Sequence, residues 1–168
     1  LQGGMALMGA AGASAVLMKA GTGEIVGYAS LPGFDPNDRP APPSDKDKAA
    51  RDPLFDRAAL GLYEQGSTFK LFTIAQALEQ GIATPGTMID IRGPLRIAGF
   101  SISDFHNLGR ELTLSDVLVK SSNIGTARLA QMIGAEAQRA FLDRLGLLDA
   151  PELELSGISH SRPLLPDR

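Results

Sequence analysis

The chain has 168 residues, of which 43% are hydrophobic, which suffices for one globular unit with a core but not for two large ones. Its formal net charge is −3 and it has no tryptophan, so it lacks the basic surface and stacking aromatics of a nucleic-acid binder, and we expect no such partner. The absence of cysteine excludes disulfides, thiolate metal sites and cysteine catalysis.

The first part of the chain is predicted to form a strand pair followed by a loop. Two apolar runs, residues 13–20 and 24–31, flank Gly21-Thr22-Gly23, which predicts an antiparallel pair within residues 1–31. Residues 32–66 are rich in proline and charged side chains and predict a long surface loop. The apolar stretch at residues 6–18 is shorter than the roughly 20 residues that cross a bilayer.

A helix is predicted over residues 67–81, with apolar side chains around most of its circumference. We therefore expect this helix to be largely buried. Its polar residues recur every three positions and form a stripe along one side: Ser67, Lys70, Thr73 and Gln76.

Residues 82–150 predict a mainly helical subdomain, and residues 151–168 a tail without periodicity. The expected elements are a small hairpin at 94–97 and 100–103 and helices at 114–120, 124–133 and 135–145. Thr113 has the position of a helix cap with Asp116 three residues on, and Ser121-Ser122-Asn123 predicts a turn that starts the next helix. The expected fold class is α+β.

The pair Ser67 and Lys70 is the strongest candidate for chemistry. One helical turn separates them, so the lysine amine is expected to reach the serine hydroxyl. A lysine in an apolar site gives up its proton more readily, which makes it a plausible general base for a serine nucleophile. The N–H group of Ser67, at the helix start, is a candidate oxyanion donor. The competing interpretation is a capping serine followed by a lysine that extends into solvent.

The remaining polar residues favour structural roles. His106 lies in a polar, turn-like stretch without a carboxylate cluster, which is typical of a solvated loop residue. Asp104, Glu111 and Asp116 are scattered over loops and a helix start, so a hydrolase with paired carboxylates is not favoured. With no glycine-rich phosphate loop either, we expect no metal and no cofactor.

Several segments together match one family. Gly66–Lys70 has the S-x-x-K pattern and Lys120–Gly125 contains S-x-N; the accompanying segments are Gly21–Val26, Ser30–Pro32, Asp35–Asn37, Leu112–Leu114 and Leu145–Leu147. In order and spacing they resemble the transpeptidase domain of class B penicillin-binding proteins. The resemblance implies a penicillin-binding and serine β-lactamase-like fold, with a central antiparallel sheet and helices on both faces.

The resemblance also implies an activity and roles for four residues. Ser67 would attack the penultimate D-Ala carbonyl of a peptidoglycan stem peptide, expel D-Ala and pass the acyl group to an amine of another stem. Lys70 would activate Ser67, Ser121 would relay a proton to the leaving group, and Asn123 would bind the substrate amide and orient Lys70. β-Lactams would acylate the same serine, and Ser122 would be structural.

Further expectations concern the type of enzyme and its surroundings. The sequence Ser121-Ser122-Asn123 resembles the septal, division-specific enzymes. The family then implies a periplasmic protein anchored in the inner membrane by a helix outside this chain, with stem peptides, β-lactams and divisome proteins as partners.

The sequence departs from the family pattern at two places. Gln65 stands where many relatives have proline, for which we expect only a local effect. No K-T-G triad occurs, so we expect the chain to cover the first half of the domain and to end before that strand. We expect very low activity from such a chain alone, because the second oxyanion donor would be missing, and self-association through an unpaired sheet edge.

Two other functions are compatible with the motifs. A serine β-lactamase or β-lactam sensor would share them, although Asp35-Pro36-Asn37 and the proline-rich loop argue against it. A non-catalytic scaffold module in cell division is the alternative from a different class. Rapid deacylation would indicate the first, and normal division with Ser67→Ala would indicate the second.

Overall fold

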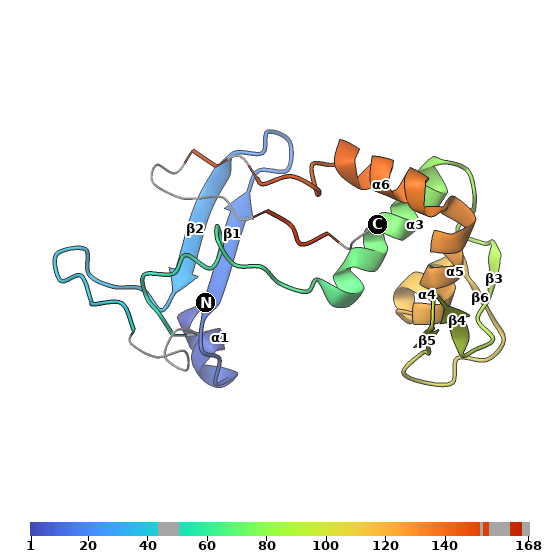
Figure 1. The fold of residues 1–168 in the computed structure, drawn as a ribbon, viewed down its shortest axis with the longest axis horizontal. Helices are drawn as coiled ribbons and strands as arrows, with labels where there is room; N and C mark the ends of the chain where they lie inside the picture. The colour runs from blue at the N-terminus through green and yellow to red at the C-terminus, as the bar shows by residue number, and fades with distance from the viewer. Residues whose placement is uncertain (44–50, 152, 155–161, 166–168) are drawn as a thin grey trace. The chain divides into compact units, whose positions relative to one another are not determined.

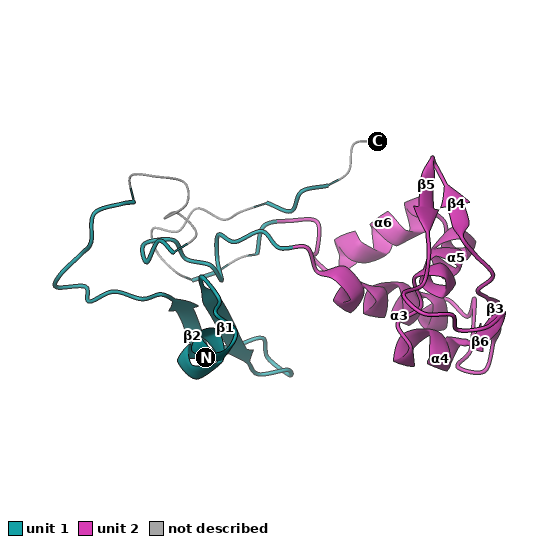
Figure 2. Cartoon of the chain, turned by 90° about the horizontal axis from the view of Figure 1, so that it is seen from below, with its two compact units in different colours: residues 1–63, 150–168 teal, residues 64–149 magenta. Residues whose placement is uncertain are grey.

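The structure is a computed structural model that describes residues 1–43, 51–151, 153–154 and 162–165. Residues 44–50 of the predicted loop and most of the predicted tail, including residues 155–161, lie outside the described part. The chain forms two compact units, one made of residues 1–63 and 150–168 and the other of residues 64–149, coloured separately in Figure 2. Each unit is described here by itself.

The first unit is built around one strand pair. After helix α1 (Gln2–Leu7), strand β1 (Ala13–Met18) runs antiparallel to β2 (Ile25–Leu31), as Figure 1 shows. The connecting turn is closed by N–H groups that donate to the Lys19 carbonyl, at 3.3 Å from Thr22 and 2.9 Å from Gly23. This confirms the predicted pair, with slightly shorter strands. Helix α1 was not predicted, because its glycine-rich sequence has low helix propensity.

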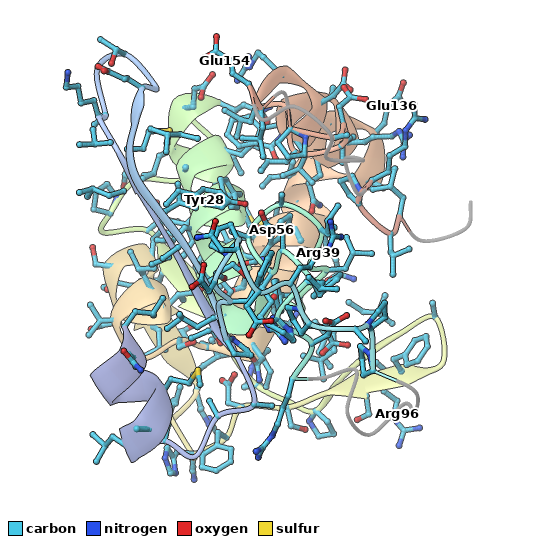
Figure 3. All side chains as sticks on the ribbon, turned by 90° about the vertical axis from the view of Figure 1, so that its left-hand side faces the viewer. Tyr28, Arg39, Asp56, Arg96, Glu136 and Glu154 are labelled. Atoms are coloured by element: carbon cyan, nitrogen blue, oxygen red, sulfur yellow. The ribbon has the colours of Figure 1, made fainter. Side chains whose placement is uncertain are left out.

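Part of the predicted proline-rich loop is anchored to β2. The Tyr28 hydroxyl donates to Asp56 Oδ1 at 2.7 Å, and the two side chains lie together in Figure 3. The same oxygen accepts bonds from the N–H groups of Ala58 and Ala59, and Ser30 Oγ accepts one from the N–H of Arg57 at 3.0 Å. Burial and the neighbouring Asp56 carboxylate raise the pKa of Tyr28, so its hydroxyl stays protonated as a donor. Residues 56–59 are therefore fixed to the strand.

The second unit combines four α-helices with two small antiparallel strand pairs (Figure 1). In chain order its elements are the 3-10 turn η1 (Gly66–Phe69), α3 (Lys70–Glu79), β3 (Met88–Asp90), β4 (Leu95–Ile97), β5 (Phe100–Ile102), β6 (Glu111–Thr113), α4 (Leu114–Val119), α5 (Asn123–Ile133) and α6 (Ala135–Arg144). Strand β3 pairs with β6 and β4 with β5, both antiparallel. The predicted hairpin and helices are confirmed to within about two residues, whereas three-residue strands such as β3 and β6 are too short to show an alternating pattern.

The core of the second unit lies where α3, α4 and α5 meet β3 and β6. Its buried members are Ile74, Ala77, Ala83, Ile89, Ile91, Leu112, Leu114, Val117, Ile124, Leu129 and Ile133. Helices α4 and α5 approach closely at Gly125, where a Cβ atom would lie 2.7 Å from Val117 Cγ2. A larger residue there would push the start of α5 away from α4.

The prediction of a largely buried helix at 67–81 is wrong. The segment begins as the 3-10 turn η1, and only Ile74, Gln76 and Ala77 of α3 are buried. Leu71 and Leu78 are 50% and 42% exposed, because α3 packs with one face against α5 and α6. Gln76 Nε2 donates to the Ala137 carbonyl at 2.8 Å, which accounts for a buried polar side chain in the stripe.

No helix in the described ranges is long and apolar enough to cross a membrane.

Candidate active site

The candidate nucleophile lies in the 3-10 turn that precedes α3. Gly66 has φ +54°, a left-handed conformation that favours glycine, and Ser67 follows it with an exposed side chain. Within the described residues, the Ser67 hydroxyl has no hydrogen-bond partner. Gln65 has φ −70°, which a proline ring also adopts, so this departure from the family pattern leaves the backbone compatible with both residues.

Lys70 connects α3 to the start of α5. Its Nζ donates to the carbonyl oxygen of Ser121 at 2.6 Å, to Ser121 Oγ at 3.0 Å and to Asn123 Oδ1 at 2.6 Å. An ammonium group has three N–H donors, so these three oxygens satisfy all of them. The sequence spacing predicts contact between Lys70 and Ser67, but the lysine amine instead bonds the S-x-N motif.

Ser121 occupies an unusual backbone conformation at the end of α4. Its φ is +54°, in the left-handed region that residues other than Gly, Asn and Asp rarely adopt. Its N–H donates to the carbonyl oxygen of Leu118 at 3.1 Å, and the N–H of Ser122 donates to the carbonyl oxygen of Val117 at 3.0 Å. These bonds close the helix, and the turn directs both the carbonyl and the hydroxyl of Ser121 to Lys70.

Ser122 points in the opposite direction from its neighbours. It is fully buried, whereas Ser121 and Asn123 are exposed. Its Oγ accepts the N–H of Gly125 at 2.9 Å and caps α5. The turn thus presents the first and third residues of the motif on one side, as the sequence predicts, and Ser122 has the expected structural role.

The side chain of Asn123 is oriented by one hydrogen-bond donor and one hydrogen-bond acceptor. Its Oδ1 accepts from Lys70, and its Nδ2 donates to the Ser103 carbonyl at 2.8 Å. Lysine only donates and a carbonyl only accepts, so exchanging the two amide ends would break both bonds. Among the described residues, the second N–H of the Asn123 amide has no hydrogen-bond partner.

Asp104 is a site residue that sequence reasoning missed. Its Oδ1 accepts the N–H groups of Asn123 at 2.5 Å and Ile124 at 3.1 Å, and its Oδ2 accepts the Ser122 hydroxyl at 2.8 Å. Asp104 lies in a loop, as predicted, but its hydrogen bonds to the start of α5 were not predicted. The sequence holds no local signal for it, since it lies 19 residues before Asn123 and outside any helical spacing.

Opposing effects set the charge state of Lys70. Burial lowers the pKa of Lys70 below its ordinary value, because desolvation disfavours the ammonium form. The Asp104 carboxylate acts in the opposite direction by attraction. Burial is the larger effect, so Lys70 releases its proton more readily than a solvated lysine.

His106 takes no part in this cluster. It is exposed and makes an edge contact with the ring of Phe105. Across the described part of the chain, no three His, Asp or Glu side chains lie close enough together to hold a metal ion.

Residues 13–163 match the family model of the penicillin-binding protein transpeptidase domain. The chain belongs to this family. The match contains both motifs that meet at Lys70 and confirms the resemblance on which the sequence analysis relied. The α+β mixture of helices and antiparallel strands agrees with the predicted fold class.

Relatives of this chain include proteins named as FtsI transpeptidases. The probable peptidoglycan D,D-transpeptidase FtsI of Caulobacter vibrioides is 38% identical over 155 residues, which is 92% of this chain and 25% of that protein. The peptidoglycan D,D-transpeptidase FtsI of Escherichia coli K12 is 33% identical over 144 residues, 86% of this chain and 23% of that protein. The chain thus spans about a quarter of the length of these curated relatives.

Solved structures show the same fold. Apo penicillin-binding protein 3 from Mycobacterium tuberculosis superimposes with a TM-score of 0.80 at 28% identity, over 97% of this chain and 35% of that one. That protein has also been crystallised with aztreonam and with ampicillin. Together with the curated relatives, it identifies the chain as part of a class B, FtsI-type transpeptidase domain.

Proposed function

We propose that the whole protein is a peptidoglycan D,D-transpeptidase that cross-links stem peptides through a serine acyl-enzyme. The observation that carries the proposal is the hydrogen bonding of Lys70 to both functional residues of S-x-N, Ser121 and Asn123. In a chain of this family, that arrangement joins a candidate base, a candidate proton relay and a candidate substrate-binding amide one helical turn from Ser67.

In the proposed acylation step, Ser67 is the nucleophile. Its Oγ forms a bond to the carbonyl carbon of the penultimate D-Ala while its proton moves to a neutral Lys70 amine. The tetrahedral intermediate then collapses, the C–N bond to the terminal D-Ala breaks, and the proton that Lys70 took from Ser67 passes through the Ser121 hydroxyl to the leaving nitrogen, which leaves Lys70 neutral. The Ser67 N–H lies in the 3-10 turn η1 and has no acceptor among the described residues, so we propose that it stabilises the developing oxyanion.

The hydrogen bonds of Lys70 indicate what has to change before this step. As an ammonium group it has a donor for each of its three oxygen partners, whereas a neutral amine has two donors and one lone pair. The contact with Ser121 Oγ is the longest of the three at 3.0 Å. We expect this contact to break, so that the two N–H donors of neutral Lys70 keep the Ser121 carbonyl and Asn123 Oδ1 as partners and the lone pair is directed at the Ser67 proton. The Ser121 hydroxyl is then available for the relay role.

The second half-reaction returns the site to its starting state. The amine of a neighbouring stem peptide attacks the acyl-enzyme carbonyl and gives up a proton through Ser121 to Lys70, and Lys70 passes a proton to Ser67 Oγ as the ester bond breaks. Asn123 donates its free amide N–H to the peptide carbonyl of the donor stem and keeps it aligned with Ser67 in both halves.

The proposed ligands, location and partners follow from the family. β-Lactams would acylate Ser67, in line with the aztreonam and ampicillin complexes of the M. tuberculosis relative. We propose a periplasmic protein held in the inner membrane by an anchor outside these residues, working with divisome proteins. Self-association of the present chain through the edges of the β1–β2 pair remains a prediction.

The proposal is tested by D-Ala release from a stem-peptide donor by the whole protein, with and without an acceptor amine. A transpeptidase releases D-Ala and forms a cross-linked product, and Ser67→Ala abolishes both. Fast hydrolysis of a penicillin without cross-linking would identify a β-lactamase instead. Absence of any adduct, together with normal cell division in a Ser67→Ala strain, would identify a scaffold.

A further inference from the structure

A single carboxylate holds the turn that carries the S-x-N motif. Asp104 lies in the loop after β5 and accepts hydrogen bonds from three consecutive residues at the start of α5, namely Ser122, Asn123 and Ile124. Bonds from two backbone N–H groups and a hydroxyl to one carboxylate are charge-assisted and stronger than neutral ones. The carboxylate also lies at the positive end of the helix dipole.

The three donors depend on Asp104 to different degrees. Ser122 is fully buried, so without Asp104 its hydroxyl proton loses its acceptor in a place that water does not reach. The N–H of Asn123, which forms the shortest of the three bonds at 2.5 Å, lies in the first turn of α5, where N–H groups have no partner within the helix. The neighbouring Ser103 carbonyl accepts from the Asn123 side chain at 2.8 Å. Residues 103 and 104 together therefore fix both the backbone and the side chain of Asn123.

By holding this turn, Asp104 also fixes the position of Lys70, the candidate base. Asn123 Oδ1 and the two oxygens of Ser121 hold Lys70, so a shift of the turn moves every hydrogen-bond acceptor of the amine. Asp104 also acts on Lys70 through its negative charge. Misplacement of a reacting group by about 1 Å can lower a rate by about 100-fold.

We infer that Asp104 is a positioning residue of the reaction, which holds the S-x-N motif in alignment with Lys70. The inference rests on the proposed function for its effect on rate. Its effect on Lys70 itself depends on the hydrogen bonds and the charge described above, and not on the proposed function. Asp104 does not touch the reacting atoms and is not a catalytic residue.

The whole protein carrying Asp104→Asn tests the inference, because asparagine retains the shape and one acceptor oxygen but loses the charge. Asp116→Asn is the matched control: Asp116 is also a half-buried aspartate beside a helix start, in the first turn of α4, but without a hydrogen bond to the Lys70 cluster. We expect Asp104→Asn to lower the first-order rate of acylation by benzylpenicillin about 10- to 100-fold. Asp116→Asn is expected to stay within about twofold of the unchanged protein.

A titration of Lys70, followed by the NMR shift of its ε-carbon, separates positioning from simple helix capping and does not require an active enzyme. Loss of the Asp104 charge should move the Lys70 midpoint to lower pH, whereas Asp116→Asn should leave it in place. An unchanged Lys70 midpoint in Asp104→Asn, or acylation at the rate of the unchanged protein, would overturn the inference. Failure of the unchanged protein to form an adduct would instead count against the proposed function, and the Lys70 titration would still decide the role of Asp104.

Discussion

Lys70 Nζ lies 2.6 Å from Asn123 Oδ1, and this bond joins two motifs that are 53 residues apart in the chain. The opposite end of the same amide is held by the Ser103 carbonyl, so the amine meets an oxygen whose direction is fixed. Lysine is a flexible side chain, and three acceptors in a rigid turn restrict it to one position. The proposed mechanism depends on this restriction.

The pH dependence of acylation should reflect the lowered pKa of Lys70. The base must be neutral, so the acylation rate rises with pH as Lys70 loses its proton. Burial depresses the pKa of Lys70 from the ordinary value of 10.5, and the rise should therefore be complete at lower pH than for a solvated lysine. Rates of penicillin acylation across a pH series provide the measurement. A rise centred at or above 10.5 would contradict the assignment of Lys70 as a desolvated base.

Asn123→Asp should shift this pH profile in the opposite direction. The substitution places a carboxylate beside the Lys70 amine, which favours the ammonium form and raises the pKa of Lys70. The acidic limb of the acylation profile should move to higher pH. Asn123→Ala, which removes the acceptor without adding charge, provides the control and should lower the rate without that upward shift. If the two variants had the same profile, Asn123 would not be in electrostatic contact with the base.

Ser121 allows the role of its backbone to be separated from that of its hydroxyl. Its φ of +54° is unfavourable for alanine and favourable for glycine, so Ser121→Gly should be more stable than Ser121→Ala by about 1 kcal/mol. Both variants lack the hydroxyl and should lose acylation to the same extent. Urea unfolding and penicillin labelling of the two proteins test this expectation. Full penicillin labelling of Ser121→Gly would show that acylation does not require the Ser121 hydroxyl.

Leu129 should be among the most sensitive core positions of the second unit. It is fully buried on α5, and Leu129→Ala should lower the free energy of unfolding by about 2 to 5 kcal/mol because a cavity remains. Met132 lies on the same helix and is 54% exposed, so Met132→Ala should change stability by less than about 1 kcal/mol. Denaturant unfolding of both variants provides the comparison, and equal losses would contradict the described packing of α5.

The parts of the molecule with strong local signals could be predicted from the sequence. The β1–β2 pair, the three helices after Thr113 and the cap at Thr113 follow from apolar periodicity and from residues that bond their own backbone. The proximity of Lys70 to Asn123 followed from the family resemblance, because nothing in the spacing of residues so far apart determines a contact. Burial of the S-x-x-K helix was overestimated, since an apolar composition does not reveal which faces find a partner.

Asp104 shows why the remainder of the site escaped sequence reasoning. A single aspartate between two short segments belongs to no periodic pattern and to no local motif, and most loop aspartates have structural or solvent-exposed roles. Its importance arises from tertiary structure, which brings the loop after β5 against the start of α5. The strained backbone of Ser121 is similar, since a serine in a turn gives no sign of a positive φ. Both features arise where two elements meet, and sequence patterns describe elements one at a time.

Intact-mass analysis of the whole protein after incubation with benzylpenicillin, followed by peptide mapping, tests the central claim most directly. We predict an added mass equal to the intact penicillin, on a peptide that contains Ser67, and no adduct in Ser67→Ala. An adduct that persists in Ser67→Ala, or maps to another peptide, would contradict the assignment of Ser67 as the nucleophile that Lys70 activates.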